Sequence, residues 1–157
     1  MEMKKPRYFL WILAVEAVGF LSGILSREGT DRYASMANKP PLSPPGWVFP
    51  IVWTVLFALM GIGAARVAAA PAGKNRARAL NVFVAQLVVN FFWSLIFFNA
   101  QAYGFAFLWL LLLWVLIAGM ILLFRSVDRA AAWLQVPYLL WVSFAGYLNF
   151  MIWQMNR

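Results

Sequence analysis

Indole rings and side-chain amides are the groups on which any chemistry of this chain must rest. The sequence contains nine tryptophans but no cysteine and no histidine. Thiolate nucleophiles, serine–histidine pairs, imidazole haem ligands and most zinc sites are therefore excluded. We expect no metal site and no resident cofactor, so a ligand would have to be held by ring stacking and hydrogen bonds.

The segment around residue 90 places polar and aromatic side chains on one helical face. Gln86, Asn90 and Ser94 recur at intervals of four residues, and Trp93 and Phe97 occupy adjoining positions. In a membrane helix this face cannot contact lipid, because an amide without a partner in hydrocarbon costs several kcal/mol. The face must point at another helix, where it would form interhelical hydrogen bonds, or at a pocket, which the pairing of Asn90 with Trp93 favours.

A second stripe begins at residue 141. Trp141, Ala145 and Asn149 are again four residues apart, so a large ring, a recess and an amide share one helical face. A recess beside a ring can accept a flat ligand, whereas small residues can also serve close helix packing. Trp53 and Phe57, one turn apart in an earlier segment, add rings that favour the ligand.

The composition predicts that these faces lie in membrane-spanning helices. Of 157 residues, 13 are basic, 5 are acidic and 64% are hydrophobic, a balance that a water-soluble domain would have to expose as apolar patches. The uncharged run 79–124 contains 46 residues. As a helix it would measure about 69 Å at ~1.5 Å per residue, against a hydrocarbon core of ~30 Å, so it must cross twice.

The same length test, applied to the whole chain, predicts an all-α integral membrane protein, a five-helix bundle that forms a single domain over residues 1–157. The expected helices are 8–25, 47–69, 80–98, 103–124 and 131–155. Pro137 should kink the last of them near its start.

Basic residues predict the orientation of the bundle. Nine lie on the side of the N terminus and four on the other side, which by the positive-inside rule places the N terminus in the cytoplasm. The nine are Lys4, Lys5, Arg7, Arg66, Lys74, Arg76, Arg78, Arg125 and Arg129. Although the formal net charge is +8, these residues are divided among membrane-flanking loops, so we expect the lipid bilayer and no nucleic acid as a partner.

Residues 26–46 are predicted to form a proline-rich lid loop. Each proline fixes its own φ and restricts the preceding residue, so the run up to Gly46 should be stiff. A preordered lid over a cavity loses less entropy when ligand binds, although a rigid loop with an interfacial tryptophan is the alternative. The prolines in and after this run are Pro40, Pro41, Pro44, Pro45 and Pro50.

Glu16 is the one ionisable side chain well inside a predicted span, a position that indicates function by default in a bilayer. It would be protonated, or hydrogen-bonded to an amide such as Gln86 or a hydroxyl such as Ser143. Gly19 and Gly23 form a GxxxG spacing that suits tight helix contact or a homodimer seam.

Four blocks of the sequence resemble the TspO/MBR family, the tryptophan-rich sensory proteins that include the mitochondrial translocator protein, or peripheral-type benzodiazepine receptor. The blocks are KPPLSPPGWVFPIVW (39–53), WTVLFALMGIG (53–63), QLVVNFFWSLIFF (86–98) and VPYLLWVSFAGYLNFMIW (136–153). The resemblance implies a bacterial member of the family in the cell membrane, often a homodimer. Such proteins bind porphyrins such as protoporphyrin IX, and in animals cholesterol and benzodiazepine-type drugs, in a cavity capped by the first loop.

By matching position, the resemblance also implies which residues line the cavity. They are Trp53, Asn90, Trp93, Trp141 and Ala145; Phe57 lies beside Trp53, and Tyr33 would fold over the mouth. Some bacterial members promote light-dependent degradation of protoporphyrin IX, which makes Trp53 and Trp141 the candidate catalytic residues, as electron or oxygen-reaction partners. No general acid, base or metal site supports an ordinary enzymatic cycle. The alternative function is transport or sensing of small lipophilic molecules: tetrapyrroles, sterol-like ligands or benzodiazepine-type ligands.

Two features depart from the family pattern. Between Tyr33 and Lys39 the chain is one residue longer than usual, which affects the register of the lid. After Tyr147 the next basic residue is Arg157, ten positions on, beyond the spacing of the sterol-recognition pattern. Specific cholesterol binding is therefore disfavoured.

Overall fold

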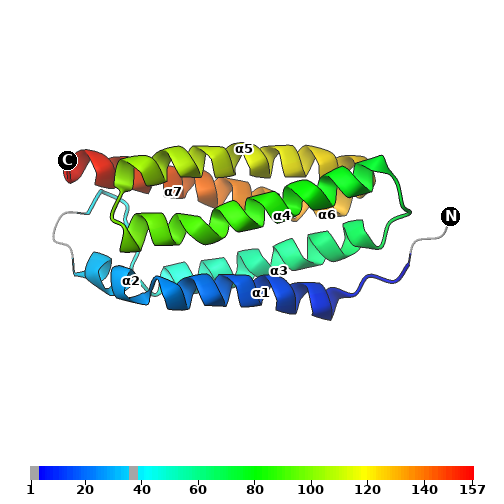
Figure 1. Ribbon diagram of the computed structural model, residues 1–157, viewed down its shortest axis with the longest axis horizontal. Helices are drawn as coiled ribbons and strands as arrows, with labels where there is room; N and C mark the ends of the chain where they lie inside the picture. The colour runs from blue at the N-terminus through cyan, green and yellow to red at the C-terminus, as the bar shows by residue number, and fades with distance from the viewer. Residues whose placement is uncertain (1–3, 36–38) are drawn as a thin grey trace.

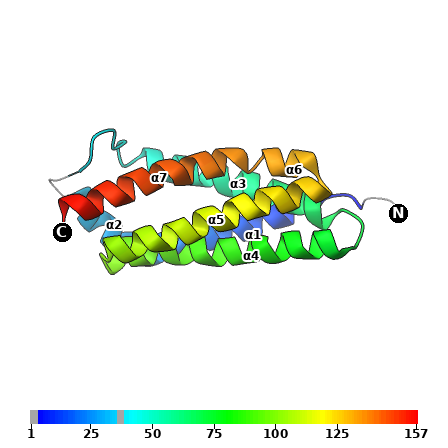
Figure 2. The same cartoon turned by 90° about the horizontal axis from the view of Figure 1, so that it is seen from above.

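The computed structural model describes residues 4–35 and 39–157 and shows long helices that run back and forth along one axis (Figure 1). The first described residues and the α3–α4 and α5–α6 connections lie at one end, here called the N-terminal end. The α2 helix, the proline-rich segment and the C terminus lie at the other end, the lid end (Figures 1 and 2). The elements are α1 (Tyr8–Leu25), α2 (Arg27–Ala34), α3 (Val48–Ala68), α4 (Lys74–Ser94), the π-helix η1 (Leu95–Asn99), α5 (Tyr103–Val127), α6 (Arg129–Trp133) and α7 (Val136–Met155).

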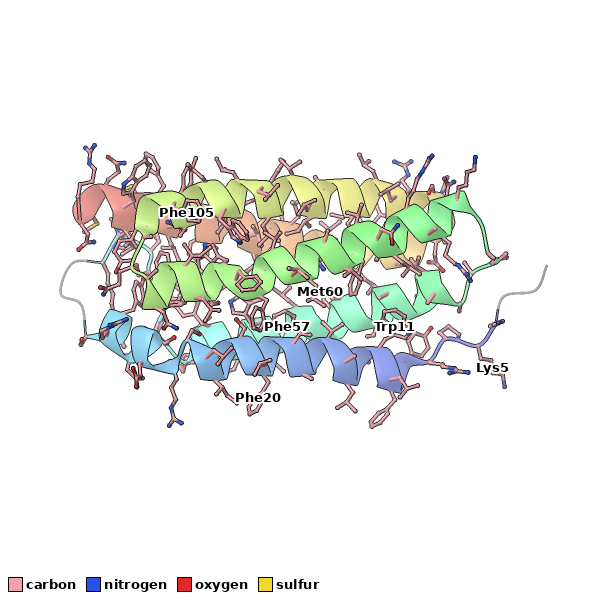
Figure 3. The ribbon with its side chains drawn as sticks, viewed as in Figure 1. Lys5, Trp11, Phe20, Phe57, Met60 and Phe105 are labelled. Carbon is pink, nitrogen blue, oxygen red and sulfur yellow. The ribbon has the colours of Figure 1, made fainter. Side chains whose placement is uncertain are left out.

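Five segments are long and apolar enough to cross a bilayer, between 18 and 27 residues each. At ~1.5 Å per residue these lengths match a hydrocarbon core of ~30 Å. Large apolar side chains on the outer faces are exposed, and Figure 3 shows Phe20 pointing away from the bundle while Phe57 and Met60 lie between helices. The predicted all-α bundle with five membrane-spanning segments is confirmed. The segments are Tyr8–Leu25, Val48–Ala68, Lys74–Asn99, Tyr103–Val127 and Arg129–Met155.

The expected loop before the second span contains a helix, which corrects the prediction for this region. Residues Arg27–Ala34 form α2. Its Gly29 packs on the Phe98 carbonyl, and Arg32 donates hydrogen bonds to the carbonyls of Phe98 and Asn99 at 3.2 and 3.1 Å. These carbonyls belong to η1, whose terminal acceptors need donors from outside the helix. A search for long apolar runs misses α2, because this helix is polar and is held by tertiary contacts.

The third and last spans differ most from their predicted bounds. The third begins at Lys74 rather than Leu80 and ends in η1. The last is broken between α6 and α7 rather than merely kinked. Pro137 lies in the first turn of α7, where its missing N–H removes no helical hydrogen bond.

Close helix contacts hold α1 against α3. In the bundle, α1 packs on α3, α4 on α5, α5 on α7 and α6 on α3 (Figure 2). A Cβ added at Gly61 would lie 2.6 Å from the Cα of Ile12, and one at Gly19 would overlap the ring of Phe57. Gly23 has open space around it. The GxxxG spacing therefore serves the α1–α3 contact through its first glycine.

An ion pair joins three segments at the N-terminal end. The Arg66 guanidinium lies 3.1 Å from one Asp128 oxygen and donates to the other at 3.2 Å. Asp128 also caps α6, because it accepts from the Ala131 N–H at 3.0 Å. Arg66 donates further to the Tyr8 hydroxyl at 3.3 Å. The two-point contact fixes α3 against the α5–α6 junction, and the bond to Tyr8 connects α1 to the same guanidinium.

We expect the ion pair between Arg66 and Asp128 to make the stability fall in acid. Partial burial by itself raises the pKa of the Asp128 carboxyl, but hydrogen bonds from Ala131 N–H and from Arg66 outweigh this effect and lower the pKa. A carboxylate with a lowered pKa stabilises the fold above its unfolded-state pKa of about 3.9, and the contribution is lost as the pH falls through the folded-state value.

Thermal unfolding in detergent can measure this contribution. At neutral pH the substitution Asp128→Asn should lower the midpoint by about 2–4 °C. Between about pH 6 and pH 3 the midpoint of the unsubstituted protein should fall further than that of Asp128→Asn, because the amide does not titrate. Equal falls in both proteins would show that this ion pair contributes nothing.

Candidate functional site

A network of three buried polar side chains connects α4 to α7 in the centre of the bundle. The Tyr138 hydroxyl donates to Gln86 Oε1 at 2.7 Å and accepts from Asn90 Nδ2 at 2.6 Å. Tyr138 and Gln86 are fully buried, and Asn90 is 7% exposed. Each group would be costly in hydrocarbon without a partner. The predicted inward face of the third span is confirmed for these amides, which here serve interhelical hydrogen bonding.

Two of the predicted rings on α3 pack around the same tyrosine. Trp53 stacks on Phe57 with ring centroids 5.5 Å apart, and it meets the edge of Tyr138 at 6.2 Å. The structure therefore brings Trp53, Phe57 and Asn90 together around Tyr138. Sequence reasoning did not single out Tyr138, although it lies seven positions before Ala145 and so on the same helical face.

Trp93 belongs to a neighbouring cluster toward the lid end. Its indole N–H donates to Asn149 Oδ1 at 3.1 Å, and Asn149 Nδ2 donates to the Tyr103 carbonyl at 2.8 Å. The Trp93 ring stacks on Phe97 at 5.0 Å, and Tyr33 from α2 meets Phe97 edge-on at 5.6 Å. Burial raises the pKa of the Tyr33 hydroxyl. Tyr33 therefore covers Phe97 at the lid end of the bundle, and the Phe97 ring contacts both Tyr33 and Trp93.

Trp141 lies on α7, half-buried, at the boundary with α3. Its ring meets Phe49 edge-on at 5.9 Å and packs at a tilt on Phe144 at 5.5 Å. Ala145 follows one turn later and is 8% exposed. Among the buried side-chain nitrogen and oxygen atoms of the described residues, two have no hydrogen-bond partner, and Trp141 Nε1 is one of them. The other, Gln135 Oε1, lies at the α6–α7 break.

Together these contacts define a seam between α3 and α7. We call Phe49, Trp53, Tyr138 and Trp141 the aromatic seam, because α3 contributes the first two rings and α7 the last two. Trp53 and Trp141 lie on the same seam, each against a ring of the facing helix. The two rings of each of these pairs are in contact, so a flat ligand that enters between them would have to part them.

Two of the pockets in the described part of the chain lie outside the aromatic seam. One is a groove of about 380 Å³ between α5 and α7, lined by apolar side chains together with Ser143, whose hydroxyl accepts from the indole of Trp114 at 2.9 Å. The other lies at the N-terminal end, where α3, α4 and α5 meet. Glu16, for which Gln86 and Ser143 were suggested as partners, lies half-buried on α1. Ser143 bonds to Trp114 instead, and Gln86 bonds to Tyr138.

The proline-rich segment is anchored on α7. The Tyr147 hydroxyl donates to the Pro41 carbonyl at 2.9 Å, Pro40 is buried, and Lys39 lies over the Tyr33 ring at 5.4 Å from its centroid. Figure 2 shows the segment reaching α3 past the C-terminal half of α7. This position suits a lid at that end of the aromatic seam. The expected extra residue between Tyr33 and Lys39 falls at positions 36–38, outside the described residues.

Comparison with known proteins gives a consistent result over the whole chain. Residues 11–154 match the model of the TspO/MBR family. The tryptophan-rich protein TspO of Chlorobaculum tepidum is 40% identical over 141 residues, 89% of each chain. Protein CrtK of Rhodobacter capsulatus is 40% identical over 156 residues, 98% of this chain and 95% of its own. The translocator protein of Ovis aries is 37% identical over 142 residues, 88% of this chain and 83% of its own.

The polar network predicts a large effect of removing one oxygen atom. Tyr138→Phe would leave Gln86 Oε1 and Asn90 Nδ2 buried without their partner, at a cost of about 1–3 kcal/mol for each group. Thermal unfolding in detergent should therefore show a midpoint lower by about 5 °C or more. Tyr147→Phe is the matched control, because it removes one hydroxyl from an exposed tyrosine. If both variants unfold at the same temperature, the network does not hold α4 to α7.

Proposed function

The chain belongs to the TspO/MBR family of multi-pass membrane proteins, and from this premise we propose that it binds a tetrapyrrole such as protoporphyrin IX at the aromatic seam. The proposed site comprises the seam and the side chains around it, with Ala145 as a recess on α7. The functional form would be a homodimer in the cell membrane with the N-terminal end in the cytoplasm, as the resemblance and the distribution of basic residues imply.

One observation carries the proposal: the indole N–H of Trp141 is buried and has no acceptor among the described residues. Buried polar groups without a partner are rare in native structures, because each costs about 1–3 kcal/mol. An acceptor on a ligand, such as a propionate oxygen, would remove this cost. The neighbouring rings of Phe49 and Trp53 offer the flat apolar surfaces on which a macrocycle stacks.

The same residues limit the chemistry that this site could perform. No group of three or more histidine, cysteine or carboxylate side chains that could hold a metal occurs in the described part of the chain. Acid–base chemistry is equally unsupported, because the titratable group of the aromatic seam is the Tyr138 hydroxyl. This hydroxyl already bonds to Gln86 and Asn90. Light-dependent oxidation of the pigment, with Trp53 and Trp141 as electron or oxygen-reaction partners, fits a site made of indoles. The protein would then act as a binding platform for photochemistry.

Replacing Trp141 should separate ligand binding from stability. Trp141→Phe keeps a ring in the seam and removes a buried donor that has no partner, a gain that offsets the packing lost with the smaller ring, so the unfolding temperature of the ligand-free protein should change little. Protoporphyrin IX should bind about fivefold more weakly, which is the effect expected for one lost hydrogen bond. Quenching of tryptophan fluorescence during titration with protoporphyrin IX measures the affinity. Unchanged affinity would remove Trp141 Nε1 from the site.

Illumination tests the photochemistry directly. With purified protein in detergent, light should bleach protoporphyrin IX faster than in detergent alone, as followed by absorbance and product mass. The double variant Trp53→Phe/Trp141→Phe should abolish the acceleration. Trp133→Phe should leave it intact, because Trp133 lies on α6 and is 73% exposed.

The outcomes of this experiment distinguish the candidate functions. Saturable quenching with equal bleaching in all variants would refute the role of Trp53 and Trp141 while leaving binding in place. Relatives named translocator protein and tryptophan-rich sensory protein are known, so passage or sensing of a lipophilic molecule is the competing function. Flux of protoporphyrin IX through proteoliposomes without loss of pigment would favour that function.

A further inference from the structure

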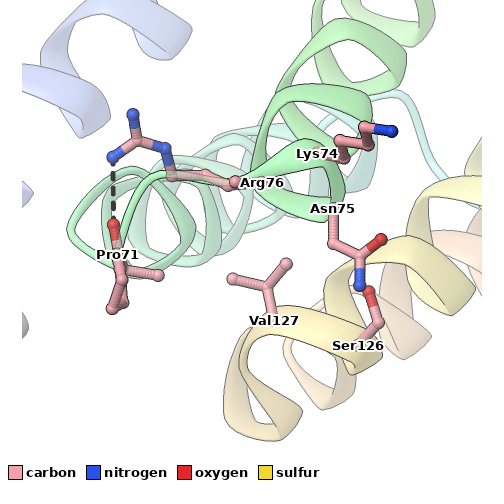
Figure 4. A pocket seen from close by; sticks show the side chains of 8 residues that line it. Pro71, Lys74, Asn75, Arg76, Ser126 and Val127 are labelled. Carbon is pink, nitrogen blue, oxygen red and sulfur yellow. Dashed lines mark hydrogen bonds between the residues drawn. The ribbon is translucent and has the colours of Figure 1, made fainter. Parts of the chain in front are cut away.

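A second site lies at the N-terminal end of the bundle, far from the aromatic seam. A pocket of about 360 Å³ opens where α4 begins and α5 ends (Figure 4). It is formed by the α3–α4 connection on one side and the last turn of α5 on the other. Its lining residues are Ala70, Pro71, Gly73, Lys74, Asn75, Arg76, Ser126 and Val127.

The lining of this pocket is basic and hydrogen-bonding. Arg76 Nη1 donates to the carbonyls of Ala70 and Ala68 at 2.9 and 3.4 Å, which holds the guanidinium at the pocket wall. These bonds use one nitrogen, and a guanidinium carries five N–H donors in all. Lys74 adds a second positive charge to the lining, and Asn75 and Ser126 add an amide and a hydroxyl (Figure 4). The chemistry of this lining suits an oxyanion.

The charge around the pocket is predominantly positive. The N-terminal end carries the nine basic residues named above. Asp128 is the acidic residue that the structure describes at this end, and its charge is balanced by Arg66 at 3.1 Å. Positive charge on neighbouring segments adds to the potential at the pocket. Among the described residues, an anion that enters the pocket therefore meets no carboxylate that lacks a basic partner.

We propose that this pocket binds the phosphate group of an anionic phospholipid headgroup. The pocket lies at the ends of membrane-spanning segments, since Val48–Ala68 ends and Lys74–Asn99 begins beside it. Headgroups of the surrounding bilayer lie at this level, and basic pockets between spanning helices bind anionic headgroups. The site is independent of ligand binding at the aromatic seam.

Lipid binding can be measured by native mass spectrometry of the detergent-solubilised protein, titrated with phosphatidylglycerol and, separately, with phosphatidylcholine. Lys74→Gln should weaken phosphatidylglycerol binding about fivefold, the effect of about 1 kcal/mol for one basic residue near a membrane surface. Ser126→Phe should do the same by filling the pocket, since Ser126 is exposed and its hydroxyl bonds within α5 to Leu123. Arg78→Gln is the matched control, because it removes the same charge from α4 outside the lining.

Each outcome decides the proposal. Loss of phosphatidylglycerol with Lys74→Gln and Ser126→Phe, but not with Arg78→Gln, and weak phosphatidylcholine binding throughout would support it. Equal weakening by Lys74→Gln and Arg78→Gln would overturn it in favour of diffuse charge at this end. Displacement of phosphatidylglycerol by millimolar inorganic phosphate would show that the pocket takes free phosphate rather than lipid. If Ser126→Phe does not fold, as judged by circular dichroism, the comparison of Lys74→Gln with Arg78→Gln still decides.

Discussion

Every polar side chain inside this bundle must find its hydrogen-bond partner within the protein, because hydrocarbon offers none. Tyr138 meets this requirement for α4, since its single hydroxyl bonds to both Gln86 and Asn90. Trp93 and Asn149 form a second connection nearer the lid end. Hydrogen bonds have defined geometry, so two connections along one pair of helices fix both the rotation and the register of α7 relative to α4. The positions of the aromatic side chains follow from that register.

The same constraint separates residues that hold the fold from residues that are free for a ligand. Asn90 and Trp93 were predicted to line a cavity, but Asn90 Nδ2 donates to Tyr138 and Trp93 Nε1 donates to Asn149 within the protein. Trp141 differs, because its ring is packed while its N–H has no acceptor. A buried donor without a partner is a cost to the free protein that a ligand can relieve. Of the three residues, Trp141 is therefore the strongest candidate for a ligand contact, although regular helical spacing singled out all three.

The sequence alone predicted the five spanning segments and the inward direction of the face around Asn90. Both depend on local rules, namely apolar length and helical periodicity. It did not predict α2, whose polar helix is held by contacts between Arg32 and η1. Nor did it single out Tyr138, since the pairing of one hydroxyl with two amides depends on how distant helices meet. The pocket at the start of α4 was missed for the same reason: it exists only where three helix ends come together.

The contacts between α3 and α7 indicate where a ligand would enter. Near the middle of α3 the two are tied by a directional bond, from Gln135 Nε2 at the start of α7 to the Leu59 carbonyl, at 3.1 Å. From there toward the lid end, the described interactions between α3 and α7 are ring contacts, with Trp53 on Tyr138 and then Phe49 on Trp141. Ring contacts are weakly directional, and a flat aromatic ligand can replace one ring face by another. Among the described residues, parting the seam from the lid end therefore breaks no hydrogen bond between the two helices, and it uncovers the buried indole N–H of Trp141, which has no acceptor.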